Sequence, residues 1–335
     1  MGLIGRTLRW KGGSAMRILL AVDGSHSSDR ARDLVAALPW SEGGRVRIVS
    51  VAPTGADLMG TPWPIATIPD DPELESEVLR IHRDALEAAE REIRSAHSDL
   101  VIESRLLRGR AATVIVEESR QMPADLVVVG HRGHGRWESI LLGSVSAEVV
   151  DHAACPVLVA RDERLGPIVL ADDGSAYARA AEAVVIEWPL FTGLTTTVVT
   201  VSEDGFPYAA AVAPMLYPEA MDGYTRATEV ERQTVAAEGE AAATRLRQAG
   251  LDATAEIRTG DPAHQIIASA GEHEAGLIVI GTRGQTGLRR LILGSVARNV
   301  LLYAPCSVLV VRGGSQAAPP SAERHDDRES ISPLA

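Results

Sequence analysis

Lysine is almost missing from this 335-residue chain, in which Lys11 is the single example. Every other side chain with a permanent positive charge is an arginine, which excludes a Walker-type lysine and a Schiff-base lysine from the rest of the chain. Cysteine is also scarce: Cys155 and Cys306 are the two present, and they form no Cys-x-x-Cys pair that would hold zinc. We expect both to be small buried residues.

Long apolar runs are missing as well. The longest fall well short of the ~18–20 residues of a membrane helix, and the N-terminus lacks the apolar core and cleavage site of a secretory leader. These absences favour a cytoplasmic protein without a membrane partner. The formal net charge of −12 argues against non-specific binding to nucleic acid or to an anionic membrane. A phosphate ligand would therefore need a local site.

The composition is that of a globular protein, with 45% hydrophobic and 23% charged residues. At ~150 residues per domain, the length predicts two domains. A repeat supports this, because the spacing Gly-x2-Gly-x9-Gly-Ser occurs twice, each time directly after a run of β-branched residues. The two copies are Gly130, Gly133, Gly143, Ser144 and Gly281, Gly284, Gly294, Ser295. Their offset, 281 − 130 = 151, is a whole domain rather than a solenoid period of ~20–50 residues.

The repeated spacing is typical of a loop that wraps phosphate. Backbone N–H groups must approach the phosphate oxygens closely, and glycine removes the Cβ that would obstruct them. Ser144 and Ser295 each begin an apolar helical run, where a helix N-terminus offers free N–H donors to an anion. The glycine order is not the Gly-x-Gly-x-x-Gly of dinucleotide-binding folds.

Strand and helix patterns alternate in both halves, which predicts parallel sheets with helices on both faces. The predicted fold is two tandem doubly wound, Rossmann-like α/β domains, each with a five-stranded, mainly parallel sheet. The predicted strands are 17–22, 45–51, 101–107, 126–129, 157–160, 168–171, 195–201, 253–258, 277–280 and 307–311. The predicted helices are 28–38, 73–97, 111–121, 144–152, 228–249, 263–270 and 295–302. A ligand crevice is expected at the carboxyl ends of the strands.

The expected organisation is an N-terminal extension at 1–15, domains at 16–161 and 166–312, and a disordered tail at 313–335 that is rich in Ser, Pro, Ala and charge. Two long loops interrupt the pattern, at 53–72 and 202–223. They contain the apolar residues Met59, Trp63, Phe206, Tyr208, Met215 and Tyr217. Such loops either serve as lids or partner surfaces, or pack locally onto the body.

An acidic turn ends the first strand of each half, as Asp23-Gly24-Ser25 and Asp173-Gly174-Ser175. An acid at this edge either accepts hydrogen bonds from a base or holds Mg²⁺ between phosphates. The alternative is a helix N-cap, worth about 1 kcal/mol, and the two roles are compatible.

With these motifs, and with the closing strands that begin at Cys155-Pro156 and at Cys306, the sequence resembles two universal stress protein domains in tandem, over roughly residues 16–160 and 167–312. The glycine pattern is that family's ATP-binding signature. The resemblance implies one ATP site per domain with accompanying Mg²⁺, a regulatory role in the stress response, and pairing of the two last strands within the chain, with further homodimerisation. A protein partner is not predicted.

The resemblance also implies site residues. In the first half these are Ala21, Val22 and Asp23 near the adenine, Val51 beside the base, Val129 and Gly130 near the ribose, and Gly133, Gly143, Ser144, Val145 and Ser146 around the phosphates. Their counterparts are Ala171, Asp172, Asp173, Val201, Ile280, Gly281, Gly284, Gly294, Ser295, Val296 and Ala297. Arg132 and Arg283, inside the glycine loops, are added as phosphate counter-charges or exposed loop arginines.

The halves differ at Asp172, which replaces Val22, and at Gly276, which replaces Asp125; either difference would make the two affinities unequal. His131 and His134 are not expected to bind metal, because no acid cluster completes a ligand set. No catalytic residue is predicted, since no His, Glu or Lys repeats beside the loops. A slow ATP hydrolase or nucleotide-transfer enzyme, and an AMP-sensing or protein-interaction module, remain the alternative functions.

Overall fold

The computed structural model describes residues 15–40, 43–54, 72–133, 142–202, 218–282, 284 and 293–313. Strands and helices alternate along the first half as the patterns predict. They are β1 (Arg17–Ala21), α1 (His26–Ala37), β2 (Arg45–Ala52), α3 (Pro72–Ala96), β3 (Val101–Arg108), α4 (Ala111–Gln121), β4 (Leu126–Gly130), α5 (Ser144–His152) and β5 (Val157–Ala160).

The second half repeats this order and adds one short 3-10 turn. Its elements are β6 (Ile168–Ala171), α6 (Ala176–Glu187), η1 (Pro189–Phe191), β7 (Thr195–Ser202), α8 (Pro218–Gln248), β8 (Asp252–Thr259), α9 (Pro262–Glu272), β9 (Leu277–Gly281), α10 (Ser295–Tyr303) and β10 (Ser307–Val311). The prediction for α8 was wrong at its start, because the helix begins at Pro218 rather than at residue 228. Proline suits the first turn of a helix, where its missing N–H costs no bond.

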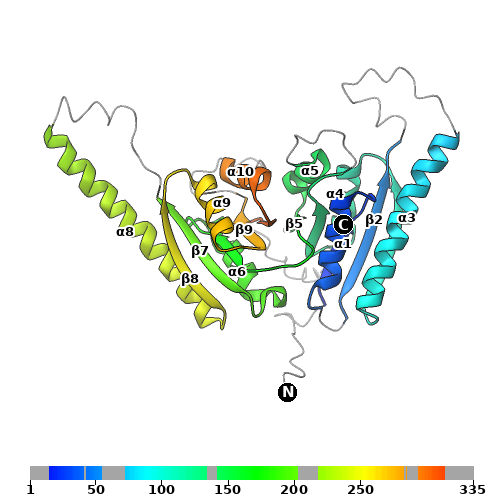
Figure 1. Cartoon of the computed structure of the whole chain (residues 1–335), viewed down its shortest axis with the longest axis horizontal. Coiled ribbons are helices and arrows are strands. Elements are labelled where there is room, and N and C mark those ends of the chain that lie inside the picture. Colours follow the sequence, from blue (N-terminus) through cyan, green and yellow to red (C-terminus); the bar gives the residue numbers. More distant parts are fainter. Residues whose placement is uncertain are drawn as a thin grey trace, which may run out of the picture.

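All ten strands join one sheet, in the order β3-β2-β1-β4-β5-β10-β9-β6-β7-β8. Neighbouring strands within each half are parallel, whereas β5 and β10 are antiparallel, with Val159 opposite Val308 and Leu158 opposite Leu309. The last strands therefore pair within the chain, as the resemblance implies. Figure 1 shows the resulting shape: α3 and α8 form the two outer flanks, and β5 and β10 meet near the centre.

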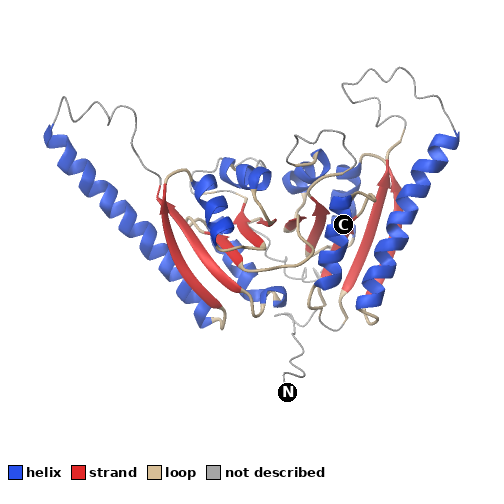
Figure 2. Cartoon of the chain, in the orientation of Figure 1, coloured by secondary structure: helices blue, strands red, loops and turns tan. Residues whose placement is uncertain are grey.

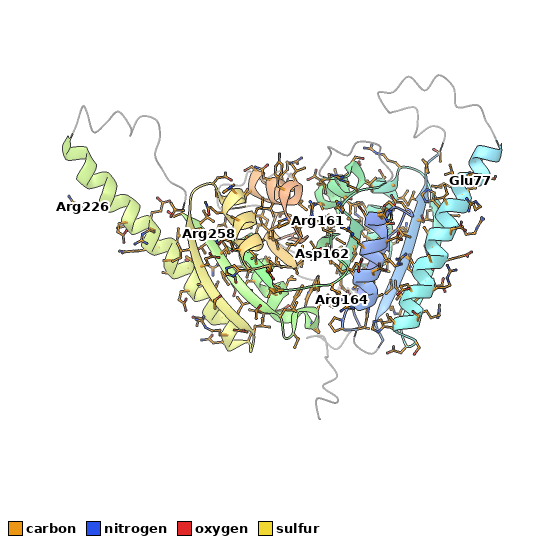
Figure 3. The ribbon with its side chains drawn as sticks, in the orientation of Figure 1. Glu77, Arg161, Asp162, Arg164, Arg226 and Arg258 are labelled. Carbon is orange, nitrogen blue, oxygen red and sulfur yellow. The ribbon has the colours of Figure 1, made fainter. Side chains whose placement is uncertain are left out.

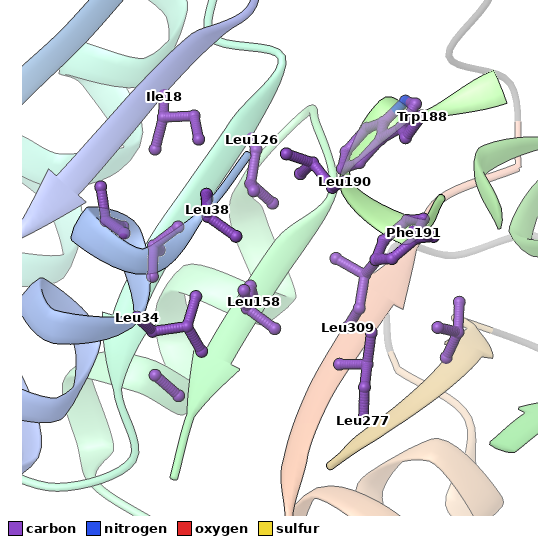
Figure 4. Close-up of a cluster of buried hydrophobic side chains, with 14 of the residues drawn as sticks. Ile18, Leu34, Leu38, Leu126, Leu158, Trp188, Leu190, Phe191, Leu277 and Leu309 are labelled. Carbon is purple, nitrogen blue, oxygen red and sulfur yellow. The ribbon is translucent and has the colours of Figure 1, made fainter. Parts of the chain in front are cut away.

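Helices cover both faces of this sheet (Figure 2), and each face buries one hydrophobic cluster. One cluster lies under α1, α3, α6 and α8 and includes Leu34, Leu158, Phe191 and Leu309. Figure 4 shows its residues from both halves of the chain. The other lies under α4, α5, α9 and α10. Both clusters contain residues of both halves, so the core on each face of the sheet continues from one domain into the other.

The replacement of Asp125 by Gly276 in the second domain affects contacts at the start of β4 and β9, and not the glycine loops. Asp125 accepts hydrogen bonds from the backbone N of Arg17 at 2.9 Å and from its guanidinium at 3.0 and 3.2 Å. At Gly276, a Cβ would lie 2.4 Å from the backbone N of Gly166, so a side chain does not fit there. Both positions precede β4 or β9, at the opposite end of these strands from the loops.

Candidate functional site

The acidic turn after β1 is a tight reversal that depends on glycine. Gly24 has φ +80° and Gly174, after β6, has φ +72°. Residues with a Cβ rarely adopt this left-handed backbone conformation. Glycine at the centre of Asp-Gly-Ser therefore allows the turn that places the next serine at the start of a helix.

The serine of each turn is the helix cap. Ser25 Oγ accepts a hydrogen bond from the backbone N of Ser28 at 3.3 Å, and Ser175 Oγ accepts one from Ala178 at 3.1 Å. Asp23 Oδ1 in turn accepts from the backbone N of Ser25 at 3.0 Å and from its hydroxyl at 2.6 Å. Asp23 therefore positions the capping serine. The turn does cap the helix, as the alternative interpretation proposed, but the capping residue is Ser25 and not Asp23.

The second oxygen of each aspartate faces the glycine loop. A Cβ on Gly133 would lie 2.7 Å from Asp23 Oδ2, and one on Gly284 would lie 2.6 Å from Asp173 Oδ2. Real Cβ atoms do not approach an oxygen so closely, so with any other residue here the carboxylate would have to move away from the loop. The structure thus brings together, in both domains, the acid after the first strand and the second glycine of the motif.

The first glycine of the motif also has no room for a side chain. A Cβ on Gly130 would lie 2.6 Å from the backbone C and O of Ser27, in the first turn of α1. One on Gly281 would lie 2.8 Å from the same atoms of Tyr177 in α6. Ser146 Oγ donates to the Gly130 carbonyl at 2.6 Å, which joins α5 to the end of β4. In the second domain Ala297 replaces Ser146.

The third glycine is the N-cap of the last helix in each domain. Gly143 N donates to the His131 carbonyl at 2.7 Å, and Gly294 N donates to the Thr282 carbonyl at 2.8 Å. Neither α5 nor α10 receives a side-chain cap from the described residues, and Ser144 and Ser295 are exposed. Uncapped first-turn N–H groups and the positive end of the helix dipole favour a bound anion.

The other predicted site residues lie mostly at the same edge. Asp23 and Arg132 are half-buried, Asp173 is exposed, and the side chain of Val145 is 37% exposed. The buried members are Val22, Val51, Val129, Ala171, Asp172, Ile280 and Ala297. Ala21, Val201 and Val296 are half-buried. Arg283 and His134, together with the apolar residues predicted for the two long loops, lie outside the described residues.

His131 takes part in a contact between the glycine loop and α1. Its Nδ1 lies 3.2 Å from Ser27 Oγ. Burial, followed by the positive charges of Arg161, Arg132 and Arg30, lowers the pKa of His131 to about 4. The ring is therefore neutral near pH 7. Within the part of the chain that the structure describes, no three His, Cys, Asp or Glu residues form a metal-binding group.

The lowered pKa of His131 predicts a loss of stability in mild acid. The unfolded chain takes up a proton near pH 6.5 and the folded state only near 4, so the free energy of unfolding falls as the pH drops through this window. In His131→Gln, which keeps a polar partner for Ser27, the fall between pH 7 and 4 becomes shallower. Urea unfolding at several pH values measures this, and parallel curves for the two proteins would contradict it.

Asp172 distinguishes the second domain from the first. It is buried where the first domain has Val22, and its Oδ1 accepts a hydrogen bond from the backbone N of Gly174 at 2.9 Å. Burial, reinforced by the charges of Glu182 and Asp173, raises the pKa of its carboxyl. Arg245, the nearby cation, already binds Glu182 at 2.6 and 2.7 Å.

Replacing Asp172 by Val, the residue of the first domain, should therefore stabilise the protein at pH 7. The folded-state pKa is raised, so the cost of the charge is present at neutral pH and vanishes once the carboxyl is protonated in both states. The gain should shrink as the pH approaches 4. Asp172→Asn keeps an acceptor for the Gly174 N–H and so separates the effect of the charge from that of packing. A gain in stability that is independent of pH would show that the charge of Asp172 is not its cause.

Both cysteines are buried, as expected, and burial raises the pKa of Cys155 to about 11 and that of Cys306 to about 12. Neither thiol is activated as a nucleophile.

Some contacts at this edge escaped the sequence analysis. Ser50 Oγ donates to the Val22 carbonyl at 2.7 Å and lies 2.7 Å from His82 Nδ1, which ties α3 to the ends of β1 and β2. Arg161 and Arg312, which follow β5 and β10, reach across the domain boundary. They occupy equivalent positions in the repeat (312 − 161 = 151), but the repeat alone does not show what they contact.

The fold and the site define a class: a protein of two tandem Rossmann-like α/β domains that share one sheet, with an acid, a glycine loop and a helix N-terminus at the carboxyl edge of each. The universal stress protein family model matches residues 15–161 and again residues 165–312. The chain therefore belongs to the universal stress protein family, which confirms the resemblance and the predicted fold.

Relatives of similar architecture exist among known proteins. A universal stress protein of Mycolicibacterium smegmatis is 27% identical over 312 residues, covering 88% of this chain and 96% of its own. Universal stress protein Rv2623 of Mycobacterium tuberculosis is 26% identical over 227 residues, or 63% and 68% of the two chains. The crystal structure of a universal stress protein from Archaeoglobus fulgidus superposes with a TM-score of 0.59 at 22% identity, covering 89% of this chain and 98% of that one. That likeness shows a shared fold.

In the described residues, no helix combines the length and apolar character needed to span a membrane.

Proposed function

We propose that this chain binds two ATP molecules, one at the carboxyl edge of each domain, and acts as a cytoplasmic regulator in the stress response. We assign the sites to residues 16–161 and 166–312. The supporting observation is the repeated cluster at this edge. Asp23 with Gly133 beside the uncapped start of α5, and Asp173 with Gly284 beside the uncapped start of α10, are built in the same way.

The residues present fit a nucleotide. The glycine positions leave backbone where a Cβ would intrude, and the first turns of α5 and α10 offer N–H donors to phosphate oxygens. The aspartate after the first strand supplies an acceptor for the adenosine part of the ligand or an oxygen for Mg²⁺. Mg²⁺ would accompany the phosphates, because it would reduce the repulsion between their negative charges and a chain of net charge −12.

Binding without efficient turnover is the favoured activity. Hydrolysis requires a group that orients water and a cation that stabilises the transferring phosphoryl group. Among the described residues, Asp23 braces Ser25, and His131 is neutral and in contact with Ser27. In the second domain Thr282 replaces His131, so this residue is not a shared catalytic group.

The test is calorimetric titration of the full chain with ATP, with AMP, and with ATP in the presence of a chelator of Mg²⁺, beside an assay for released phosphate. We expect two equivalents of ATP, weaker binding of AMP, weaker ATP binding without Mg²⁺, and no sustained phosphate release. Tighter binding of AMP would identify an AMP sensor, and no binding by folded protein would point to a protein-interaction module. Phosphate release that is lost in Asp23→Ala, Asp173→Ala protein would identify an ATP hydrolase.

A further inference from the structure

Two arginines cross the boundary between the domains in a reciprocal arrangement. Arg161, directly after β5, donates from Nη2 to the carbonyl oxygens of Leu301 at 2.5 Å and Leu302 at 3.5 Å, near the end of α10. Arg312, directly after β10, donates from Nη2 to the carbonyl oxygens of Val150 at 2.7 Å and of Asp151, near the end of α5. Each domain thus sends an arginine from its last strand to the last helix of the other.

The helices that these arginines hold are the ones that begin at the glycine loops. α5 and α10 have nine residues each, a length of about 13 Å. Their last-turn carbonyls lack partners within the helix, so a guanidinium there supplies hydrogen bonds and complements the negative end of the dipole. An anion at one end of the helix and an arginine at the other therefore act on the same rigid element.

The arginine of the first domain is itself held firmly. Ser307 Oγ, fully buried in β10, accepts from the backbone N of Arg161 at 3.0 Å and from that of Asp162 at 3.2 Å. The Arg161 carbonyl accepts from Arg30 of α1 at 2.9 Å. Figure 3 shows Arg161 and Asp162 near the centre of the molecule. Arg298 of α10 adds an ion pair to Asp151 of α5 at 3.6 Å.

We propose that Arg312 and Arg161 are positioning residues for the nucleotide sites of the opposite domains. Arg312, although part of the second domain, sets the position of α5 and thereby the affinity of the first site. Arg161 does the same for α10 and the second site. This inference rests on the proposed function, since it concerns the same two sites.

The experiment measures ATP affinity in full-length proteins with a single site left. Gly294→Glu isolates the first site and Gly143→Glu isolates the second. In the first background, Arg312→Met should weaken ATP binding about five- to tenfold, whereas Arg161→Met should change it less than about twofold. In the second background the two effects should exchange. Arg312→Lys, which keeps a charge and a donor, should recover part of the loss.

A matched control comes from Arg110, which contacts α5 away from its C-terminus through Glu148, at 2.8 Å on an exposed surface. Arg110→Met should leave both affinities unchanged. Amide hydrogen exchange gives a readout without nucleotide: Arg312→Met should speed exchange in the last turn of α5 and not in α10.

The outcomes separate the two claims. If neither single-site parent binds ATP while remaining folded, the proposed function fails and the inference fails with it. If the parents bind but each arginine affects its own domain, both domains equally, or neither, only the inference is overturned.

Discussion

Gly130→Ala lowers the free energy of unfolding by about 3 kcal/mol, because the added methyl group meets backbone and not a side chain that can move away. Its Cβ would lie 2.6 Å from the C and O of Ser27 and 2.9 Å from the N of Ser28. The first turn of α1 must then shift away from β4, which disturbs the capped turn after β1. Gly281→Ala has the same effect in the second domain, since its Cβ meets the Tyr177 backbone at 2.8 Å. Urea unfolding followed by circular dichroism measures both.

The control for this prediction is Gly271→Ala in α9. Nothing lies within 4 Å of a Cβ at Gly271, so alanine should leave stability unchanged or raise it by about 0.5–1 kcal/mol through its better helix propensity. Equal unfolding midpoints for Gly130→Ala and Gly271→Ala would mean that β4 and α1 do not approach as the structure shows.

Gly143→Glu should weaken ATP binding at the first site by about 100-fold or more, a loss of about 2.7 kcal/mol. The carboxylate places a negative charge at the N-cap of α5, where the phosphates are proposed to bind, and its Cβ meets the His131 carbonyl and Arg132 Cα at 3.3 Å. Gly294→Glu should do the same at the second site. Titration of each variant with a fluorescent ATP analogue measures the loss, which should appear as one tight site in place of two.

Gln248→Glu provides the matching charge control, because it adds one negative charge at an exposed position at the end of α8. Its affinities should equal those of the unaltered protein. Equal losses in all three variants would assign the effect to net charge and not to the site.

The fold was predictable because its local signals agree. β-branched runs, the alternation of strand and helix patterns and the 151-residue repeat all pointed to two doubly wound domains. The start of α8 was not predicted correctly. Residues 202–223 were assigned to a long loop, whereas the structure has helix from Pro218. The short turn η1 was also missed, since Pro189–Phe191 is stabilised by tertiary packing, with Phe191 buried and Trp188 stacked on it at 6.1 Å.

The position of the candidate residues at one edge of the sheet was predictable, but the contacts between them were not. The doubly wound strand order placed Asp23 at the same edge as the glycine loop. It did not show that Gly133 lies against the carboxylate, or that Ser25 rather than Asp23 caps α1. The reach of Arg312 to α5 depends on the antiparallel pairing of β5 with β10, so it follows from the join between the domains and not from any local pattern.

The central claim is that each domain holds one ATP, and native mass spectrometry of the full chain with ATP and Mg²⁺ tests it most directly by counting bound nucleotides. The account predicts two for the unaltered protein, one for Gly143→Glu, one for Gly294→Glu and none for the double variant. A folded, unaltered chain that carries no nucleotide, or a double variant that still carries two, would contradict it.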